Sequence, residues 1–275
     1  MVRYGDVSNR DDSDMWNTRL LGLLWNKVRC VKNSLSMRIW NLNIRWAVYR
    51  VNMNTKMQVV TGPFAGMIVS SEHVFGAPIA KLLGTYEKEL HPYLQKIIQS
   101  GVSKVMDIGG AEGYYAIGMA LQESVKHVLV WESLGTGREI IRKLAQSNLV
   151  EGKIRINEEC DEAALYKAIM HSSTNGFLIM DIEGAELELL SLRVCEALHS
   201  WKFIVEIHEF IIPGCREILL ERFKKSHSVT IVRTRERVKE DYPMRAPLLI
   251  SVKKWLMNEG RPGPMEWLVG MPLNS

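Results

Sequence analysis

A stretch in the middle of the chain, residues 104–116 (KVMDIGGAEGYYA), constrains the fold more than any other part of the sequence. A short apolar, β-branched run leads to an acid, Asp107, a glycine-bearing turn follows, and a helical pattern begins near Gly113. This order predicts the first strand, the loop beyond its carboxyl end and the returning helix of a parallel α/β sheet. The nicotinamide fingerprint Gly-x-Gly-x-x-Gly needs a glycine where the chain has Ala111, so we do not expect a nicotinamide oxidoreductase.

The rest of the sequence alternates between strand and helix patterns. Further strands are predicted at 127–131, 153–157, 177–181, 203–209, 229–235 and 266–270. Helices are predicted at 113–122, 136–148, 162–171, from 185, at 215–225 and at 247–258. Earlier, residues 57–61 and 67–71 predict a hairpin, and residues 81–100 predict a helix that Thr85 would cap. The alternation is typical of an α/β fold with helices on both faces of a mostly parallel sheet.

Two predicted loops carry residues suited to an adenosine ligand. Glu132 ends the second strand, nineteen residues after Gly113, where a carboxylate can accept both ribose hydroxyls. Asp161 is a candidate N-cap for the helix at 162–171. The adenine edge is expected near the same loop, so Cys160 is a candidate contact to it.

The fourth and fifth predicted strands also end in polar residues. Asp181 and Glu183 follow an unbroken apolar run of the kind that is buried on both faces of a sheet. Glu206 and His208 are two residues apart and therefore share one face of their strand. Because parallel strands put their carboxyl ends at one edge, these side chains are expected to meet there. Glu186 is interpreted as an acid stabilised by the start of a helix.

The segment before the first strand permits two interpretations. Tyr86 and Glu87 lie in a stretch that runs directly into the first strand, which suits a lid over a ligand pocket. Alternatively, Glu87 and Glu89 only favour the positive end of the helix that Thr85 would cap.

The motifs, taken together and in order, resemble those of the FkbM-type S-adenosylmethionine-dependent methyltransferases. The motifs are Asp107-x-Gly109, Gly113-Tyr114-Tyr115, Glu132, Asp181-Ile182-Glu183-Gly184-Ala185-Glu186 and Glu206-Ile207-His208. The likeness covers residues 102–235 well and 62–89 loosely, and it does not cover 1–55. It implies a Rossmann-like, seven-stranded, mostly parallel sheet whose last strand is antiparallel. It also implies methylation of a hydroxyl group, often on a sugar or other small metabolite.

The resemblance assigns cofactor contacts residue by residue. Around the methionine and ribose parts of S-adenosylmethionine it places Asp107, Gly109, Gly110, Gly113 and Tyr114. It places Glu132 on the ribose hydroxyls and Asp181 beside the sulfonium. Glu112 departs from the small residues common in this loop, and either meets the cofactor's ammonium or points to solvent.

Two mechanisms stay open for a hydroxyl acceptor, which must lose its proton. His208 is a candidate base, because its reference pKa of about 6.5 suits neutral pH, and Asp181 or Glu206 would orient it. Alternatively, Asp181, Glu183, Glu206 and His208 would hold a divalent ion that acidifies the acceptor. Oxygen-rich ligands with one imidazole suit Mg or Mn better than Zn.

Composition indicates an ordinary globular protein. At 275 residues, 47% of them hydrophobic, the chain can bury a large core. The four cysteines (Cys30, Cys160, Cys195 and Cys215) form no Cys-x-x-Cys pair, which argues against a disulfide framework or a zinc site and fits a reducing compartment. No apolar run is long enough to span a bilayer and no signal peptide pattern opens the chain, so a cytoplasmic location, possible also at a membrane surface, is expected.

The positive charge gathers near the start of the chain. Residues 15–60 hold eight Lys or Arg and no acid, on an amphipathic helical pattern with interspersed tryptophans. Three regions are therefore predicted: a basic helical extension (1–56), a hairpin and lid helix (57–101) and the methyltransferase domain (102–275). The extension either packs on the domain or in a homodimer, or binds a membrane surface or an acidic partner. The alternative function is a non-catalytic RNA- or membrane-binding module that uses this extension.

Overall fold

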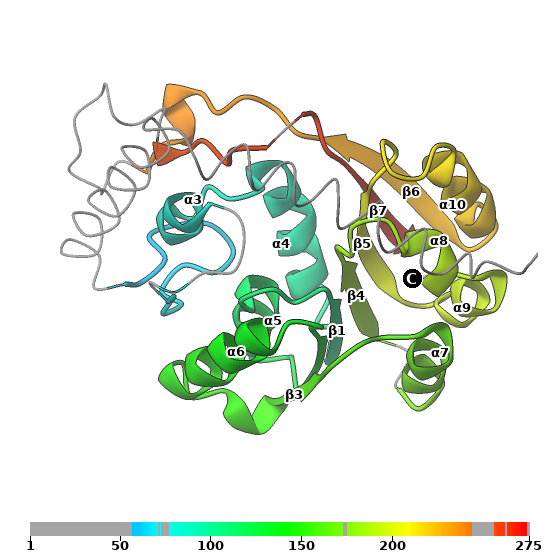
Figure 1. Ribbon diagram of the computed structural model, residues 1–275, viewed down its shortest axis with the longest axis horizontal. Coiled ribbons are helices and arrows are strands. Elements are labelled where there is room, and N and C mark those ends of the chain that lie inside the picture. Colours follow the sequence, from blue (N-terminus) through cyan, green and yellow to red (C-terminus); the bar gives the residue numbers. More distant parts are fainter. Residues whose placement is uncertain are drawn as a thin grey trace, which may run out of the picture. The chain divides into compact units, whose positions relative to one another are not determined.

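The apolar runs form a seven-stranded sheet in the computed structural model, which describes residues 57–70, 72, 77–172, 175–243, 256–261 and 263–273. The strands are β1 (Lys104–Ile108), β2 (His127–Trp131), β3 (Ile154–Asn157), β4 (Gly176–Met180), β5 (Lys202–Ile207), β6 (His227–Arg233) and β7 (Glu266–Pro272). Their order is β3-β2-β1-β4-β5-β7-β6 (Figure 1). The strands from β3 to β5 pair in parallel, and β7 runs antiparallel to both β5 and β6. The predicted Rossmann-like α/β fold is confirmed.

Helices cover both faces of this sheet. They are α3 (Pro78–Leu83), α4 (His91–Gln99), α5 (Tyr114–Ala120), α6 (Gly135–Ser147), α7 (Glu162–Met170), α8 (Glu186–Leu189), α9 (Leu192–Ala197) and α10 (Cys215–Phe223). Alternate strand residues enter two apolar clusters: Val105 and Ile179 pack with α4, α5 and α6, whereas Met106 and Met180 pack with α7 to α10. Figure 1 shows these two groups of helices on opposite sides of the strands.

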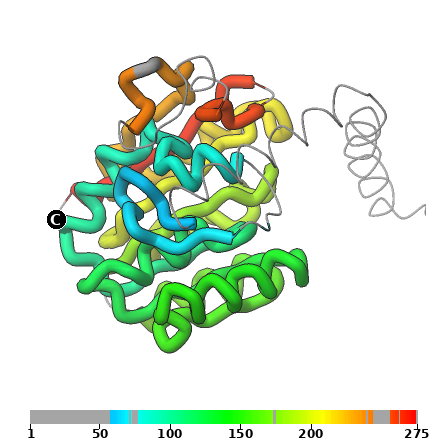
Figure 2. The backbone as a smooth tube through the Cα atoms, turned by 90° about the vertical axis from the view of Figure 1, so that its left-hand side faces the viewer, coloured from blue at the N-terminus to red at the C-terminus, as the bar shows by residue number. Residues whose placement is uncertain are grey.

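The hairpin before the sheet is confirmed as a short antiparallel pair. Gln58 and Ile68 form its bridge, and the amide of Val59 donates to the carbonyl of Met67 at 2.8 Å. Phe64, at its turn, packs its ring on Gly118 of α5, so the hairpin (blue in Figure 2) is attached to the core.

Two predicted helices are each interrupted in the structure. The prediction of one helix over 81–100 is wrong. Helix α3 ends at Gly84, whose backbone is in the left-handed conformation, and α4 begins only at His91. Thr85 caps neither helix; its hydroxyl donates to the carbonyl of Ala80 at 3.4 Å. The helix predicted from 185 is divided into α8 and α9, because Ser191 caps a new helix by accepting from an amide three residues ahead. Local patterns show apolar spacing but not these changes of direction.

Some predicted elements fall outside the described residues. They are the basic extension over 1–56 and the part of the 247–258 helix that precedes Leu256. Within the described part of the chain, no helix combines the length and apolar character needed to cross a bilayer. The N-cap role of Asp161 is confirmed, since its carboxylate accepts from the amide of Ala164 at 2.7 Å.

Candidate functional site

Strand register brings the predicted acids into neighbouring rows. Asp107 of β1 pairs with Ile179 of β4, which pairs with Ile204 of β5. Two residues further along, the same register places Gly109, Asp181 and Glu206 side by side, and Glu206 pairs with Trp267 of β7. Because side chains alternate along a strand, all of these face the same side of the sheet. The acids therefore converge although they are far apart in sequence.

These rows line a pocket at the carboxyl ends of β1, β4 and β5. Its lining is Lys81, Tyr86, Glu87, Asp107, Gly109, Gly110, Ala111, Glu112, Tyr114, Tyr115, Ile179, Met180, Asp181, Ile204, Glu206 and Trp267. The strand order reverses direction between β1 and β4, which is where open α/β sheets bind their ligands. The cavity itself measures about 50 Å³, well below the roughly 300–1,000 Å³ of typical ligand sites. The chain's own side chains thus fill most of it.

The glycine turn after β1 is held by Glu132. Its carboxylate accepts from the amides of Ala111 at 2.6 Å and Leu134 at 2.7 Å, and so ties the turn to the end of β2. A Cβ on Gly109 would lie 1.8 Å from the carbonyl oxygen of Asp181, so close packing of β1 against β4 requires glycine there. Glu132 is not part of the pocket lining, and neither are Gly113 and Cys160.

Asp107 lies on the pocket floor with an unsatisfied oxygen. The residue is 3% exposed and its Oδ2 has no hydrogen-bond partner among the described residues. Burial raises the pKa of Asp107 to about 7; a backbone hydrogen bond from Ala116 opposes this, and the charges of Glu132 and Asp181 add to it. A cationic donor beside Oδ2 would satisfy the carboxylate.

Lys81 occupies the end of the pocket nearest the glycine turn. Its ammonium forms a buried ion pair with Glu112 and lies 4.6 Å from the centroid of the Tyr86 ring. Glu112 therefore points inward, yet its second oxygen, Oε2, has no partner in the described part of the chain. The rings of Tyr86, Tyr114 and Tyr115 pack edge to face or tilted around this cation.

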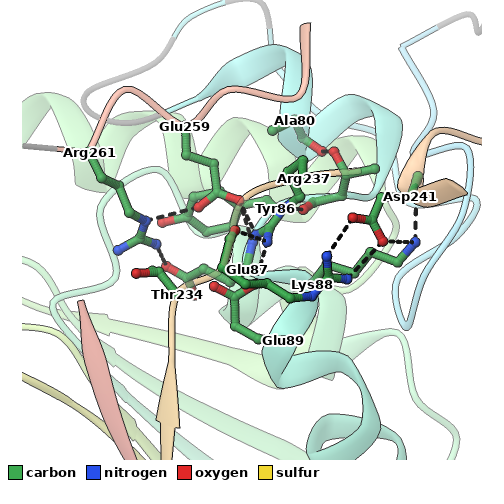
Figure 3. A network of polar contacts seen from close by, with 12 residues as sticks. Ala80, Tyr86, Glu87, Lys88, Glu89, Thr234, Arg237, Asp241, Glu259 and Arg261 are labelled. Carbon is green, nitrogen blue, oxygen red and sulfur yellow. Dashed lines mark hydrogen bonds and ion pairs between the residues drawn. The ribbon is translucent and has the colours of Figure 1, made fainter. Parts of the chain in front are cut away.

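Arg261 lies against two acidic residues of the pocket lining. Its guanidinium pairs with Glu87, with Glu206 at 3.1 Å and with Glu259 at 2.9 Å. Figure 3 shows Arg261 pointing toward Glu87 and Glu259. Glu259 also forms an ion pair with Arg237. Through its ion pair with Arg261, Glu87, a predicted lid residue, connects its own loop to the segment 256–261.

His208 lies behind Asp181 and is held by Glu186. The imidazole Nδ1 is 2.6 Å from Glu186 Oε1, and since an ionised carboxylate only accepts, Nδ1 carries the proton. Nε2 faces Asp181 at 3.6 Å and Glu183 at 3.7 Å. Glu186 begins α8, as the helix-start interpretation predicts, but its side chain is also fully buried against His208. Glu206 does not orient the imidazole; its partner is Arg261.

The charges around His208 and Asp181 shift the pKa values of both groups. Burial lowers the pKa of His208, but the hydrogen bond to Glu186 and the charges of Glu186, Asp181 and Glu183 outweigh it, so the pKa is raised. The side chain of Asp181 is 46% exposed, and Asp181 lines the pocket. The surrounding protein and the charge of Glu87 raise the pKa of Asp181 to about 6, against the opposing effect of His208.

Backbone strain gathers at the same place. Five described residues other than glycine have positive φ, and three of them, Glu87, Ala111 and Glu183, belong to this site. Each such conformation costs on the order of 1–3 kcal/mol and persists only where the surroundings enforce it. The site is therefore held in a geometry that the local sequence would not choose.

A metal ion is chemically compatible with part of the predicted set. One ligand atom each from Asp181, Glu206 and His208 lies within 4.8 Å of the others. Glu183, the fourth predicted ligand, approaches His208 at 3.7 Å but is 79% exposed. In the described arrangement, however, Glu206 is engaged with Arg261 and would have to exchange that partner for an ion.

The structure thus separates the predicted site residues into three groups. Eight line one pocket: Tyr86, Glu87, Asp107, Gly109, Gly110, Tyr114, Asp181 and Glu206. Three lie behind the lining, namely His208, Glu183 and Glu132. Gly113 and Cys160 serve packing: a Cβ on Gly113 would meet Ile141 at 3.0 Å, and Cys160 packs at the edge of the α7 to α10 cluster.

Sequence reasoning missed several residues of this site, among them Lys81, Glu186, Arg261 and Trp267. Lys81 carried a usable signal, because it interrupts the apolar run Ile79-Ala80-Lys81-Leu82-Leu83 and so had to be buried or paired. Arg261 carried none, since its two partners in the pocket lining lie 55 and 174 residues away.

Comparison with known proteins adds little beyond fold. No protein-family model matches the chain, and no curated protein sequence matches it significantly. Among solved structures, a candidate O-methyltransferase from Klebsiella pneumoniae is 12% identical with a TM-score of 0.46, covering 82% of this chain and 89% of that one. An rRNA methylase from Streptococcus thermophilus is 9% identical with a TM-score of 0.46, covering 66% and 96%. At such scores these likenesses carry no argument about function.

Proposed function

We propose that the protein is an S-adenosylmethionine-dependent methyltransferase. The observation that carries this proposal is the charge of the pocket at the reversal of strand order. Among the described lining residues, five have carboxyl side chains, namely Glu87, Asp107, Glu112, Asp181 and Glu206, against the ammonium of Lys81 and the adjoining guanidinium of Arg261, which pairs with Glu87 and Glu206. S-adenosylmethionine brings two positive charges, the sulfonium and the ammonium, and one carboxylate, so an acid-rich pocket favours it electrostatically.

The residues present fit this cofactor. Asp107 Oδ2 and Glu112 Oε2 are buried acceptors without partners among the described residues, which the cofactor's ammonium would satisfy. The aromatic rings around Lys81 suit a second cation. Because the cavity is only about 50 Å³, binding requires the side chains of Lys81 or Arg261 to move aside. Glu132, already bonded to two amides, would accept from ribose hydroxyls with its remaining lone pairs.

The cofactor, when bound, supplies an activated methyl group on a sulfonium. The protein's own part is to align an acceptor and to remove its proton, and alignment alone can supply roughly 7–11 kcal/mol in favourable systems. His208 Nε2, with Nδ1 fixed by Glu186, is arranged as a general base. Asp181, whose pKa lies near 6, stands between that base and the pocket and can pass a proton to it.

The finer assignment rests on the resemblance in the sequence. The Asp181-Ile182-Glu183-Gly184-Ala185-Glu186 element favours an FkbM-type enzyme and hence a hydroxyl group of a sugar or small metabolite as acceptor. The buried Glu186–His208 pair supports this, because a hydroxyl acceptor needs a base and that pair provides one.

Calorimetry on the full chain tests the cofactor directly. S-adenosylmethionine is expected to bind more tightly than its demethylated product, since the product lacks the sulfonium charge. Asp107→Asn should weaken both, whereas Arg193→Gln, on an exposed pair with Glu162 outside the pocket, should change neither. If neither compound gives a heat of binding, the proposal is refuted.

The role of the base is tested by pH profiles of methyl transfer. Glu186 raises the pKa of His208, so Glu186→Gln should lower that pKa and move the rising limb of kcat to lower pH, with a smaller plateau. His208→Asn should abolish turnover and leave cofactor affinity unchanged. An unshifted limb in Glu186→Gln, or normal turnover in His208→Asn, would remove His208 as the base.

In the alternative mechanism, Asp181, Glu206 and His208 hold a divalent ion, Mg or Mn. It would acidify the acceptor directly, without a histidine base. Exhaustive chelation followed by re-addition of each metal distinguishes the two. Full activity after chelation excludes the metal, and activity that returns only with Mg or Mn supports it.

A further inference from the structure

The guanidinium of Arg261 lies in a complete binding site for an organic cation. It contacts three carboxylates, those of Glu87, Glu206 and Glu259. Its Cζ lies 4.9 Å from the Trp267 ring centroid and 5.8 Å from that of Tyr86. Carboxylates in the plane of a cation and rings over its face are the two elements that recognise guanidinium and ammonium groups.

The carboxylates of this site are buried and belong to the pocket. The side chains of Glu87 and Glu206 are 3% and 5% exposed, and both line the cavity together with Tyr86 and Trp267. Glu87 is also fixed by a hydrogen bond from the Tyr115 hydroxyl and by its own strained backbone.

Arg261 itself adjoins an exposed stretch of backbone. It follows Gly260, which is exposed and has positive φ, and a Cβ at that position would meet no described atom within 4 Å. Arg261 is not part of either apolar cluster, and its side chain is 17% exposed. Withdrawing its guanidinium breaks these ion pairs and uncovers one side of the Trp267 and Tyr86 rings.

We propose that Glu87, Glu206, Tyr86 and Trp267 form the subsite for a cationic group on the methyl acceptor, and that Arg261 occupies it as an internal stand-in. The acceptor is then a hydroxyl compound that also carries an ammonium or guanidinium group, such as an amino sugar. This inference rests on the proposed methyl transfer and adds the substrate class.

In the proposed arrangement the cation and the hydroxyl of the acceptor bind at two ends of the pocket. The acceptor's cation replaces Arg261, and its hydroxyl lies toward Asp181, which adjoins Glu206 in the strand register and faces His208. In the transfer an O–CH₃ bond forms and the S–CH₃ bond breaks, with its electron pair returning to sulfur. The hydroxyl proton passes to His208 Nε2, directly or through Asp181.

A first experiment tests the subsite without any reaction. In Arg261→Ala at pH 8, methylguanidinium at millimolar concentration should raise Tm by several degrees, whereas its neutral isostere methylurea should not. Arg261→Gln, which also removes the positive charge, serves if the alanine variant folds poorly, and Arg193→Gln should respond to neither compound. An equal response to methylguanidinium and methylurea would overturn the subsite.

A second experiment tests the acceptor class on the wild-type protein with labelled cofactor. Methyl glucosaminide is compared with methyl glucoside, and 3-aminopropanol with 1,3-propanediol, by methyl transfer and by calorimetry in the presence of the demethylated product. The cationic member of at least one pair should bind or react roughly tenfold better, and Glu206→Gln should reduce that preference toward one. Equal behaviour within every pair, or no binding of either cationic member, would overturn the acceptor class.

The two failures are distinguishable. If the cofactor itself does not bind, the methyltransferase proposal fails, while the methylguanidinium result still reports on the subsite. If the cofactor binds and only neutral compounds are methylated, the methyltransferase proposal stands and the cationic acceptor is excluded.

Discussion

Asp107 is buried beside the glycine turn with one oxygen unpaired among the described residues, and its pKa is raised to about 7. In an unfolded chain the same carboxyl titrates near 3.9, so the folded protein holds this proton more firmly and loses stability as pH rises from about 4 to about 7. Asp107→Asn should leave the free energy of unfolding nearly unchanged at pH 4 and raise it at pH 8. Urea denaturation at both values measures this. An equal change at both would contradict it.

Gly109 and Gly101 provide a matched pair for backbone strain. Both have positive φ, but a Cβ at 109 would meet the Asp181 carbonyl at 1.8 Å, whereas a Cβ at 101 meets nothing described within 4 Å. Gly101→Ala should cost ~1 kcal/mol for the left-handed conformation alone, and Gly109→Ala should cost at least ~2 kcal/mol, since β1 and β4 must separate. Thermal unfolding of the two variants decides whether contact or conformation dominates.

Single residues show where sequence reasoning ends. Asp181 and Glu206 were predictable, because each follows an apolar strand and strand ends meet at one edge. Arg261 was not, because its place depends on a segment that returns across the pocket from the far end of the chain. The role of Glu186 was predicted only in part, because its helix-start position is a sufficient local explanation and only the fold brings His208 against it.

Among the elements, the hairpin depends on one ring. Phe64 is 2% exposed and packs on Gly118 and Tyr114. Phe64→Ala should detach the hairpin and accelerate hydrogen exchange at the amides of Val59 and Val69, which donate across it. Truncations of this kind cost roughly 3–5 kcal/mol in a core. Phe210→Ala, at a residue 62% exposed, is the control and should leave those amides protected.

Strands were predicted more accurately than helices. From β2 onward, each strand lies within two residues of its predicted bounds. A short unbroken apolar run or an alternating run predicts a strand strongly in an α/β fold. The helices after 81 and 185 were predicted as single, because apolar spacing continues through Gly84 and Ser191 although the chain turns there. Turns set by tertiary contacts leave little trace in periodicity.

At the scale of the whole molecule, charge separates the basic extension from the rest. Residues 1–60 carry a net charge of +6 and the remainder −2. We expect a chain that begins at Met57 to keep cofactor binding and to lose binding to anionic vesicles or RNA, and that binding in the full chain should weaken steeply with salt. Vesicle co-sedimentation and RNA titration at two salt concentrations measure it. Unchanged binding after the deletion would exclude the extension as the interacting part.

The position of β7 has a consequence for biosynthesis. This strand is made after β6 but lies between β5 and β6, and its Trp267 forms a wall of the pocket. While it is still inside the ribosome, β5 presents an open edge that another nascent chain can pair with. The emerging protein therefore completes its ligand pocket and covers the open edge of β5 in a single late event, so premature termination before residue 266 should yield aggregates rather than a weakened enzyme.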